Sequence, residues 1–327
     1  MLKSETKKYC EGMLTFDDVL AAHARIKNYI KNTPVISSQK LNEELGAQIF
    51  FKMENLQETK SFKARGAFNA ILAYKEKHKK FPEKVVAQSS GNHAQGIAFV
   101  CKQFGIPALI YMAANASPFK VAASRALGAE VILCEKRIDA NRSAEEKQKE
   151  GYFFIHPSDG DEVIAGQGTA AFEALQEINK MGIKIDAIFA PCGGGGLVSG
   201  SFLAASGLAP QAKVFACEPL NANDVARSVR EGKIFSFDDS PNTVADGTRT
   251  LAVMEQSFFH LKKLAGILEI SEEEIILWQK KLCEVLEQRV ELTPGLAIAG
   301  VAQFLKNNPE LKNQKFLVII SGGNVAE

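Results

Sequence analysis

Residues 186–205, DAIFAPCGGGGLVSGSFLAA, decide the fold class of this chain of 327 residues. The stretch begins with an apolar run of strand length and continues through four consecutive glycines. It ends in a segment that we expect to be helical from Gly196 to Ala205. A strand, a loop and a helix in this order are the building unit of α/β proteins. The same order recurs on both sides of the stretch.

This recurring order predicts an α/β protein with mostly parallel sheets flanked by helices. We expect strands at 48–52, 84–88, 108–112, 130–134, 186–190, 213–217 and 315–320, and helices at 16–30, 61–80, 92–104, 117–127, 162–180, 196–205, 272–286 and 294–306. The last strand, KFLVII, is apolar throughout, which is typical of a strand buried on both faces. The length allows two domains, and no low-complexity linker divides the chain.

The composition excludes several classes of protein. With 46% apolar residues the chain can bury a core, so it is not intrinsically disordered. Its 39 basic and 38 acidic residues give a net charge of +1, so we expect no dominant polyanion-binding surface and no nucleic-acid partner. The six cysteines form no CxxC pair, which is typical of reduced thiols in a cytoplasmic protein.

One uncharged stretch, Ala187 to Ala212, raises the question of a membrane span. A proline and four glycines interrupt it, and a lipid-exposed backbone there could not satisfy its own hydrogen bonds. A buried loop is therefore the better interpretation, and we expect no membrane partner. The charged N-terminal residues also lack the apolar segment of a secretory signal.

The four glycines, Gly193 to Gly196, predict a phosphate site. Without Cβ atoms, their backbone N–H groups can turn toward one anion, and the positive end of the following helix adds to the attraction. A tight turn would explain one or two glycines but not four. Neither GxGxxG nor a following GK[ST] is present, so the dinucleotide and Walker patterns do not fit.

Two other expected strands are followed by small and polar residues. SSGNH (89–93) comes after strand 84–88, and SGGN (321–324) comes after strand 315–320. Because ligands of α/β proteins gather at the carboxyl ends of the strands, these loops and the glycine loop should form one crevice.

Lys63 lies in SFKARGA (61–67), close to an expected helix start and after a Ser/Thr cap. An exposed surface lysine is the default interpretation. The positive end of a helix, however, favours the neutral amine, and a neutral amine is the nucleophile that attacks carbonyl groups.

With SFKARGA, SSGNHAQ, GGGGL and SGGN in this order, the chain resembles the fold-type II pyridoxal-phosphate enzymes. Within them it is most similar to the serine racemase and threonine (serine) dehydratase group. The resemblance runs from about Thr33 to the last residue. It implies a tryptophan-synthase-β-like fold of two domains, each with a mostly parallel twisted sheet flanked by helices, and the cofactor in the cleft between them. Residues 1–80 and 155–327 would form the large domain, and 81–154 a small mobile domain that closes over the substrate.

The resemblance also implies roles for individual residues. Lys63 would hold the cofactor covalently and, once freed by the substrate amine, would take the Cα proton. The other cofactor contacts would be Phe62 beside the ring, Asn92 on the phenolic oxygen, Gly193, Gly194, Gly195, Gly196 and the Leu197 N–H on the phosphate, and Ser321 on the pyridine nitrogen.

Substrate contacts follow from the same resemblance. Ser89, Ser90, Gly91 and His93 would receive the substrate carboxylate, and Ser90 could return a proton to Cα. ADGTRT (245–250) and Glu291 of ELTPG are expected near the site. Lys60 stands where the family usually has glycine. With a neutral hydroxyl at Ser321 in place of a carboxylate, the cofactor ring would delocalise a Cα carbanion less. This favours loss of a β-leaving group.

A second cluster follows the expected strand 213–217. The carboxylates of Glu218 and Asp224 and the carbonyl of Ala222 are oxygen ligands of the kind that hard cations prefer. A solvated loop with an aspartate helix cap is the simpler interpretation of the residues alone. In the racemase and some dehydratases, the matching positions bind Mg²⁺ or Ca²⁺.

The expected function is pyridoxal-phosphate-dependent dehydration and deamination of L-serine, L-threonine or a related β-hydroxy amino acid, with serine racemisation as a competing outcome. The alternatives are a 3-hydroxyaspartate dehydratase, a serine- or aspartate-type racemase, a β-replacing synthase and a non-catalytic binding protein. Family members are commonly dimers, so a cytoplasmic homodimer is expected. No C-terminal regulatory domain is expected after SGGNVAE.

Overall fold

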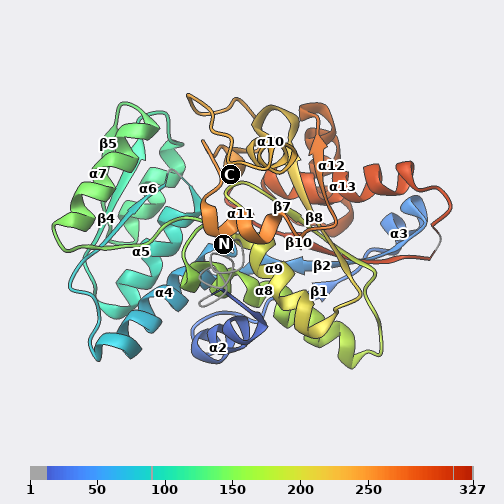
Figure 1. Ribbon diagram of the computed structural model, residues 1–327, viewed down its shortest axis with the longest axis horizontal. Helices are drawn as coiled ribbons and strands as arrows, with labels where there is room; N and C mark the ends of the chain where they lie inside the picture. The colour runs from blue at the N-terminus through green and yellow to red at the C-terminus, as the bar shows by residue number, and fades with distance from the viewer. Residues whose placement is uncertain (1–12, 90, 312, 326–327) are drawn as a thin grey trace, which may run out of the picture.

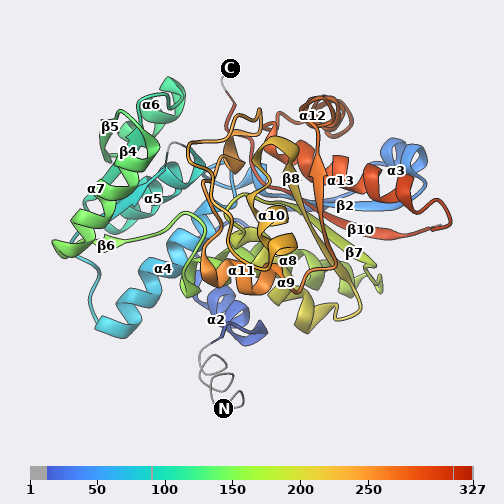
Figure 2. The same cartoon turned by 45° about the horizontal axis from the view of Figure 1, so that its top comes forward.

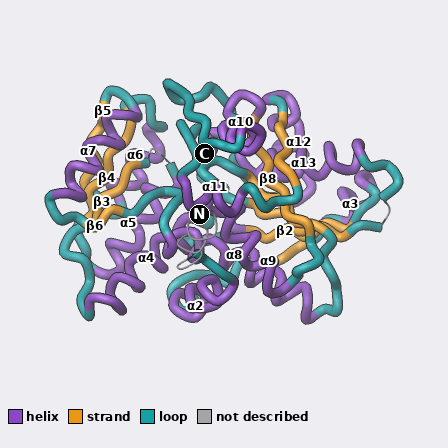
Figure 3. The backbone as a smooth tube through the Cα atoms, in the orientation of Figure 1, coloured by secondary structure: helices purple, strands orange, loops and turns teal. Residues whose placement is uncertain are grey.

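The computed structural model describes residues 13–89, 91–311 and 313–325, whose strands lie in two separate groups (Figure 3). The larger sheet has six strands in the order β1-β2-β10-β7-β8-β9. Only β1 is antiparallel to its neighbour. Its strands are β1 (Val35–Ile36), β2 (Gln48–Met53), β10 (Lys315–Ile320), β7 (Ala187–Pro191), β8 (Lys213–Pro219) and β9 (Gly266–Ile270).

The smaller sheet has four parallel strands in the order β5-β4-β3-β6. They are β3 (Val85–Gln88), β4 (Ala108–Ala113), β5 (Glu130–Cys134) and β6 (Phe153–Phe154), so all four lie between residues 85 and 154. This sheet and its helices form the left part of Figure 2. The predicted α/β class with two mostly parallel sheets is confirmed.

Helices cover both faces of the larger sheet (Figure 1). The side chains of β10 alternate between these two faces. Leu317 and Ile319 pack with the helices α2 (Phe16–Ile26), α8 (Asp161–Lys180) and α9 (Gly196–Leu208). Phe316, Val318 and Ile320 pack on the other face with α12 (Glu272–Leu286) and α13 (Thr293–Asn307). This double burial explains why KFLVII is apolar at successive positions.

The smaller sheet has the same layered arrangement. Ile110 and Met112 pack with α4 (Lys63–His78) and α5 (Asn92–Phe104). On the opposite face, Leu109 and Tyr111 pack against Ala140 and Ala144 of α7 (Arg137–Lys149). The remaining elements are α3 (Gln39–Leu45), η1 (Glu54–Leu56), α6 (Pro118–Ala126), η2 (Leu220–Ala222), α10 (Asp224–Glu231), η3 (Asp246–Thr248) and α11 (Glu255–Leu261).

Several elements were not predicted, and their burial explains why. Helix α7 buries only two alanines, so RIDANRSAEEKQK has no apolar stripe. Strand β9 is only half-buried over most of its length, and β1 and β6 have two residues each.

The assignment of 1–80 and 155–327 to a large domain and 81–154 to a small mobile domain stays a prediction. Helix α4 contributes its apolar residues to the core of the smaller sheet although its first turn lies beside the larger one.

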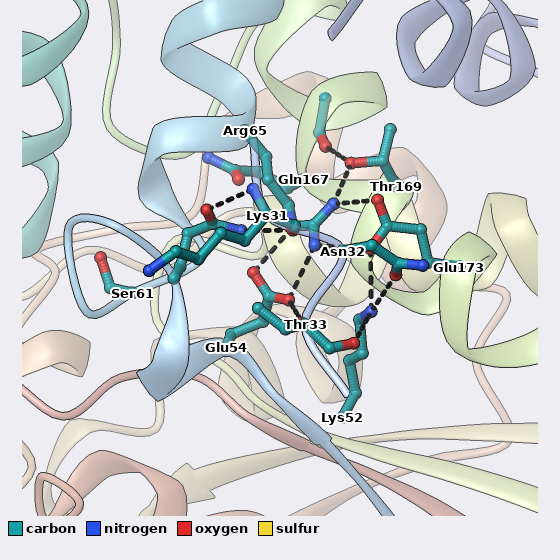
Figure 4. Close-up of polar contacts among 12 residues, drawn as sticks. Lys31, Asn32, Thr33, Lys52, Glu54, Ser61, Arg65, Gln167, Thr169 and Glu173 are labelled. Carbon is teal, nitrogen blue, oxygen red and sulfur yellow. Dashed lines mark hydrogen bonds and ion pairs between the residues drawn. The ribbon is translucent and has the colours of Figure 1, made fainter. Parts of the chain in front are cut away.

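A buried network of charged side chains holds that first turn in place (Figure 4). The fully buried Arg65 donates to Glu54 Oε2 at 2.7 Å and to Glu173 Oε2 at 2.7 Å. Lys52 Nζ lies 2.8 Å from the same oxygen of Glu173. Two cations and two carboxylates therefore balance one another, and they fix the backbone two residues beyond Lys63.

Candidate active site

A cavity of about 360 Å³ is lined by residues that follow strands of both sheets. Such residues lie at the carboxyl ends of parallel strands, where α/β proteins bind their ligands. Every predicted cofactor or substrate residue that the structure describes borders this cavity: Phe62, Lys63, Ser89, Gly91, Asn92, His93, Gly193, Gly194, Gly195, Gly196, Leu197 and Ser321. Ser90 lies outside the described residues. The single crevice predicted from the three loops is therefore present.

Lys63 is the first residue of α4, and its amine points into the cavity. Nζ donates a hydrogen bond to the carbonyl of Pro157 at 2.6 Å and lies 4.9 Å from the centre of the Phe62 ring. Burial lowers the pKa of Lys63 to about 8, and the nearby Arg137 contributes to the shift. The predicted Ser/Thr cap is wrong, because Phe62 occupies the N-cap position.

Lys60 has a left-handed backbone, with φ of 52°. Its carbonyl accepts a hydrogen bond from the Gly323 N–H at 2.8 Å. This bond joins the segment that precedes Lys63 to the SGGN loop (321–324). A left-handed position is where glycine is most at ease, so the presence of lysine here costs some strain.

The glycine loop joins β7 to α9 and presents backbone alone to the cavity. Only Gly195 has a left-handed φ, of 85°. A Cβ on Gly194 would lie 2.1 Å from Ser158 Oγ, and one on Gly193 would lie 3.0 Å from the Cα of Thr248. Gly195 thus allows the left-handed turn, and Gly193 and Gly194 allow Thr248 and Ser158 to approach the loop closely. No side chain in the part of the protein that the structure describes caps α9, so its first N–H groups are available to an anion.

Asn92 and Ser321 both border the crevice. Asn92 donates to Glu291 Oε2 at 2.7 Å and accepts from Asn324 Nδ2 at 3.0 Å. Ser321 follows β10, is 4% exposed, and its carbonyl accepts from the Phe62 N–H at 3.2 Å. The amide of Asn92 and the hydroxyl of Ser321 are thus polar groups on the cavity wall.

The predicted substrate loop lies at the start of α5. Ser89 Oγ accepts from the Gly91 N–H at 3.2 Å, and Gly91 is the N-cap of α5 without a capping side chain. His93 is buried with Nε2 2.9 Å from the carbonyl of Ile155. Burial lowers the pKa of His93 to about 3, with a further contribution from Lys63, so the imidazole is neutral. The helix start, not an imidazolium, is therefore what can attract a carboxylate here.

The sequence matches the family described as pyridoxal-phosphate dependent enzyme over residues 26–322. The chain belongs to this family of pyridoxal-phosphate dependent enzymes. It is 42% identical to the L-threo-3-hydroxyaspartate ammonia-lyase of Saccharomyces cerevisiae over 320 residues, which cover 95% of this chain and 93% of the relative. It is also 42% identical to the serine racemase of Schizosaccharomyces pombe, covering 95% and 94%. Among solved structures, a serine racemase from Dictyostelium discoideum superimposes with a TM-score of 0.85, at 36% identity, covering 96% of this chain and 99% of that one.

The residues of this pyridoxal-phosphate dependent enzyme fit the cofactor. The cavity offers an amine without an acidic partner among the described residues, a side-chain-free loop at an uncapped helix start, an amide and a hydroxyl. These groups match an aldehyde, a phosphate, a phenolic oxygen and a pyridine nitrogen in chemistry.

The sequence interpretation of this enzyme missed Lys120 of α6. Lys120 Nζ lies 2.6 Å from Asp246 Oδ2 and 3.1 Å from Glu291 Oε1, and it borders the cavity. Burial raises the pKa of Glu291, while Lys120 opposes that shift. Lys120 thus joins a helix of the smaller sheet to two carboxylates that belong with the larger one.

Arg137, the first residue of α7, was missed as well. It borders the cavity and donates a hydrogen bond to the carbonyl of Arg249. Neither cation could be found from sequence, because lysine and arginine are exposed by default and these two reach the site only through tertiary packing.

The predicted metal residues do not border the cavity and lie at the carboxyl end of β8 and in the segment that follows it. Glu218 accepts hydrogen bonds from the N–H groups of Val225 at 3.1 Å and Ala226 at 2.8 Å. Asp224 is the first residue of α10 and not its cap, and its Oδ2 accepts no hydrogen bond from the other described residues. Burial raises the pKa of Asp224 to about 7, and burial and Asp224 together raise that of Glu218. Ala222 is also fully buried.

The donor set of this cluster fits a hard cation, because two buried carboxylates lie together and neither forms an ion pair with a described lysine, arginine or histidine. Among the described residues, however, no three histidine, cysteine, aspartate or glutamate side chains form a metal-binding group. A search of the same residues for a helix long and apolar enough to cross a membrane found none.

Proposed function

We propose that this enzyme is an ammonia-lyase that converts L-serine, L-threonine or a related β-hydroxy amino acid to a 2-oxo acid and ammonia. The observation that carries the proposal is the amine of Lys63, with its pKa lowered to about 8, in the cavity that also contains the glycine loop and the start of α5. Curated relatives are named for 3-hydroxyaspartate, serine and threonine, all of which are β-hydroxy amino acids.

The cofactor residues would be Lys63 for the covalent link, the loop Gly193–196 with the Leu197 N–H for the phosphate, Asn92 for the phenolic oxygen, and Ser321 for the pyridine nitrogen. Pyridoxal phosphate, once bound, weakens the Cα–H bond of an amino acid. Phe62 lies beside Lys63 and would pack near the ring.

The chain's own groups then perform the proton transfers and orient the substrate. The start of α5, with Ser89 and Gly91, holds the substrate carboxylate through backbone N–H groups and a hydroxyl. Lys63, once free, accepts the Cα proton, because a neutral amine with a pKa near 8 is an effective general base. Ser321 offers a neutral hydroxyl, which favours rapid loss of the β-hydroxyl over a long-lived carbanion.

Racemisation of serine is part of the proposal as a competing outcome. It needs a second acid that faces Cα from the side opposite Lys63, and we assign that role to Ser90. A Ser90→Ala enzyme should still form pyruvate from L-serine but lose the formation of D-serine. Equal loss of both products would argue against this assignment.

We further propose that Glu218, Asp224 and the carbonyl of Ala222 bind Mg²⁺ or Ca²⁺. Support comes from the burial of the two carboxylates beside each other, which raises the pKa of both. Removal of metal with a chelator should lower the melting temperature, and adding either ion should restore it. Asp224→Asn protein should not respond to the ions. An identical melting temperature for verified metal-free and metal-loaded enzyme would exclude the site.

A cytoplasmic homodimer completes the proposal. The cysteines that the structure describes are all free thiols, which supports a reducing compartment. Sedimentation at several protein concentrations would test the dimer.

The direct test of the function is to supply the holoenzyme with L-serine, L-threonine and L-threo-3-hydroxyaspartate and to measure 2-oxo acid and ammonia. At least one substrate should yield both products, and Lys63→Ala should lower turnover by about 1,000-fold or more. Borohydride reduction followed by peptide mapping should place the cofactor on Lys63. A product that depends on an added nucleophile would indicate a β-replacing synthase instead. A protein that stays colourless with pyridoxal phosphate would indicate a non-catalytic binding protein.

A further inference from the structure

Arg137 is a cation in the cavity for which the proposed cofactor and the proposed α-carboxylate contacts provide no anion. It begins α7, and its side chain extends across to the loop 246–250 of the larger sheet, where it hydrogen bonds to the carbonyl of Arg249. Within the described residues it pairs with no carboxylate. Arg137 is half-buried, and a guanidinium held partly away from water without a charged partner costs free energy unless an anion joins it in the working state of the protein.

The surroundings of Arg137 add to this cost. Burial and the charge of Arg249 both lower its pKa, and Arg137 in turn lowers the pKa of Lys63. It also lies at the positive end of α7. Four carboxylates border the cavity. Asp246 and Glu291 are held by Lys120, and among the described residues neither Glu135 nor Asp239 forms an ion pair with Arg137. A ligand is therefore the source of an anion for Arg137 that these contacts leave open.

The order of the strands separates this cation from the other two anion sites. The proposed phosphate site follows β7, in the larger sheet, and the proposed α-carboxylate site follows β3. Arg137 comes after β5, and β4 lies between β3 and β5. Two strand spacings separate the carboxyl ends of β3 and β5, which lead into α5 and α7, by roughly 10 Å. The long arginine side chain can cover most of that distance, so its head group would meet the far end of a substrate held at α5.

We propose that Arg137 binds a carboxylate on the side chain of the substrate, so that β-hydroxy dicarboxylic amino acids, of which 3-hydroxyaspartate is the simplest, are the preferred substrates. The inference rests on the proposed ammonia-lyase function and makes its substrate class specific. A guanidinium binds a carboxylate through two parallel hydrogen bonds, which neither the hydroxymethyl group of serine nor the hydroxyethyl group of threonine can offer.

The first test compares kcat/KM for L-threo-3-hydroxyaspartate and L-serine in the holoenzyme. The wild-type ratio should favour hydroxyaspartate, and Arg137→Gln should lower the ratio about 100-fold, mainly through KM for hydroxyaspartate. Arg137→Lys keeps the charge but not the paired donors, and should give an intermediate ratio. The matched control is Arg142→Gln, because Arg142 lies on the same helix, is exposed and pairs only with Asp139 there; its ratio should equal that of the wild type.

The second test needs no turnover. L-Aspartate and L-asparagine have the same shape, lack the β-hydroxyl and differ by one side-chain charge. Calorimetric titration of wild-type holoenzyme should show L-aspartate binding about tenfold or more tightly than L-asparagine, and Arg137→Gln should remove most of that difference.

The outcomes separate this inference from the function on which it rests. Turnover of serine or threonine with no preference for hydroxyaspartate, or an unchanged ratio in Arg137→Gln, would overturn the role of Arg137 and leave the ammonia-lyase function intact. A loss of pyridoxal-phosphate affinity in Arg137→Gln with an unchanged ratio would assign the guanidinium to the cofactor phosphate instead. If no β-hydroxy amino acid yields a 2-oxo acid while L-aspartate still binds through Arg137, the function fails and the carboxylate site stands.

Discussion

Lys63 shows how one residue depends on its surroundings. A lysine on a helix surface is charged at neutral pH and unreactive, but this amine is buried beside a second cation, so its pKa falls to about 8. It has no charge-compensating partner among the described residues and donates only to a carbonyl. The reactivity of the site is thus prepared by the protein before any ligand is bound.

We predict that cofactor attachment to the apoprotein becomes faster as the pH rises and levels off above about pH 8, because the neutral amine is the attacking form. Stopped-flow absorbance after mixing with pyridoxal phosphate would measure the rate. Arg137→Gln should move the plateau to higher pH, since Arg137 lowers the pKa of Lys63. A rate that continues to rise to pH 10 in the wild type would contradict the lowered pKa.

Single residues also mark the limit of what sequence could reveal. The lysine, the glycine loop and Ser321 could be found because each stands at a strand end or helix start within a short pattern. The contacts of Asn92 with Glu291 and of Lys120 with Asp246 join residues more than 100 positions apart. No local pattern encodes such pairs, because they arise only when the two sheets are assembled.

At the scale of elements, the spacing of apolar residues predicted two kinds of helix and strand: those with one buried and one exposed face, and those buried on all sides. β10 could be identified because its residues are apolar on both faces of the strand. α7 could not, because only two of its residues are buried. The start of α4 was misplaced for a different reason. Its first turn is held not by a local cap but by Arg65, Glu54 and Glu173, which come from three elements.

The network around Arg65 gives a prediction for α4. Arg65→Leu removes the cation shared by two buried carboxylates, which should lower the free energy of unfolding by about 3–5 kcal/mol. The displaced first turn should also shift the absorbance of bound pyridoxal phosphate. Urea unfolding would measure the stability. Lys40→Gln, which breaks an exposed pair with Glu284, is the control and should leave the midpoint unchanged. Equal effects of the two substitutions would refute the argument.

The packing of α8 on α9 gives a second prediction at this scale. Gly168 and Gly200 face each other so closely that a Cβ on Gly200 would lie 2.5 Å from the Gly168 nitrogen and 2.5 Å from the Ile164 carbonyl oxygen. Gly200→Ala should therefore force the helices apart and destabilise the protein by about 1–3 kcal/mol, despite the better helix propensity of alanine. Ser206→Ala on the exposed side of α9 serves as the comparison, and thermal unfolding is the measurement. A stabilised Gly200→Ala protein would show that the helices can separate freely.

At the scale of the whole molecule, Lys120 links the two sheets across the cavity. Lys120→Gln removes the cation that contacts both Asp246 and the buried Glu291. We expect α6 to separate more easily from η3 and from the segment that carries Glu291. Hydrogen exchange should become faster in α6 and η3 and remain unchanged in α12. Lys147→Gln, which breaks an exposed pair within α7, should change neither. Protected amides in α6 of the Lys120→Gln protein would argue that other contacts hold the sheets together.

The position of β10 in the middle of the larger sheet, between β2 and β7, bears on how the chain is made. During synthesis, all four strands of the smaller sheet have left the ribosome once residue 154 has emerged, so that sheet can form early. The larger sheet must wait for residues 315–320 to pair with residues 48–53. A nascent chain therefore lacks the strand between β2 and β7 until residue 320 has emerged, and the cavity lacks Ser321, which borders it, until the same stage.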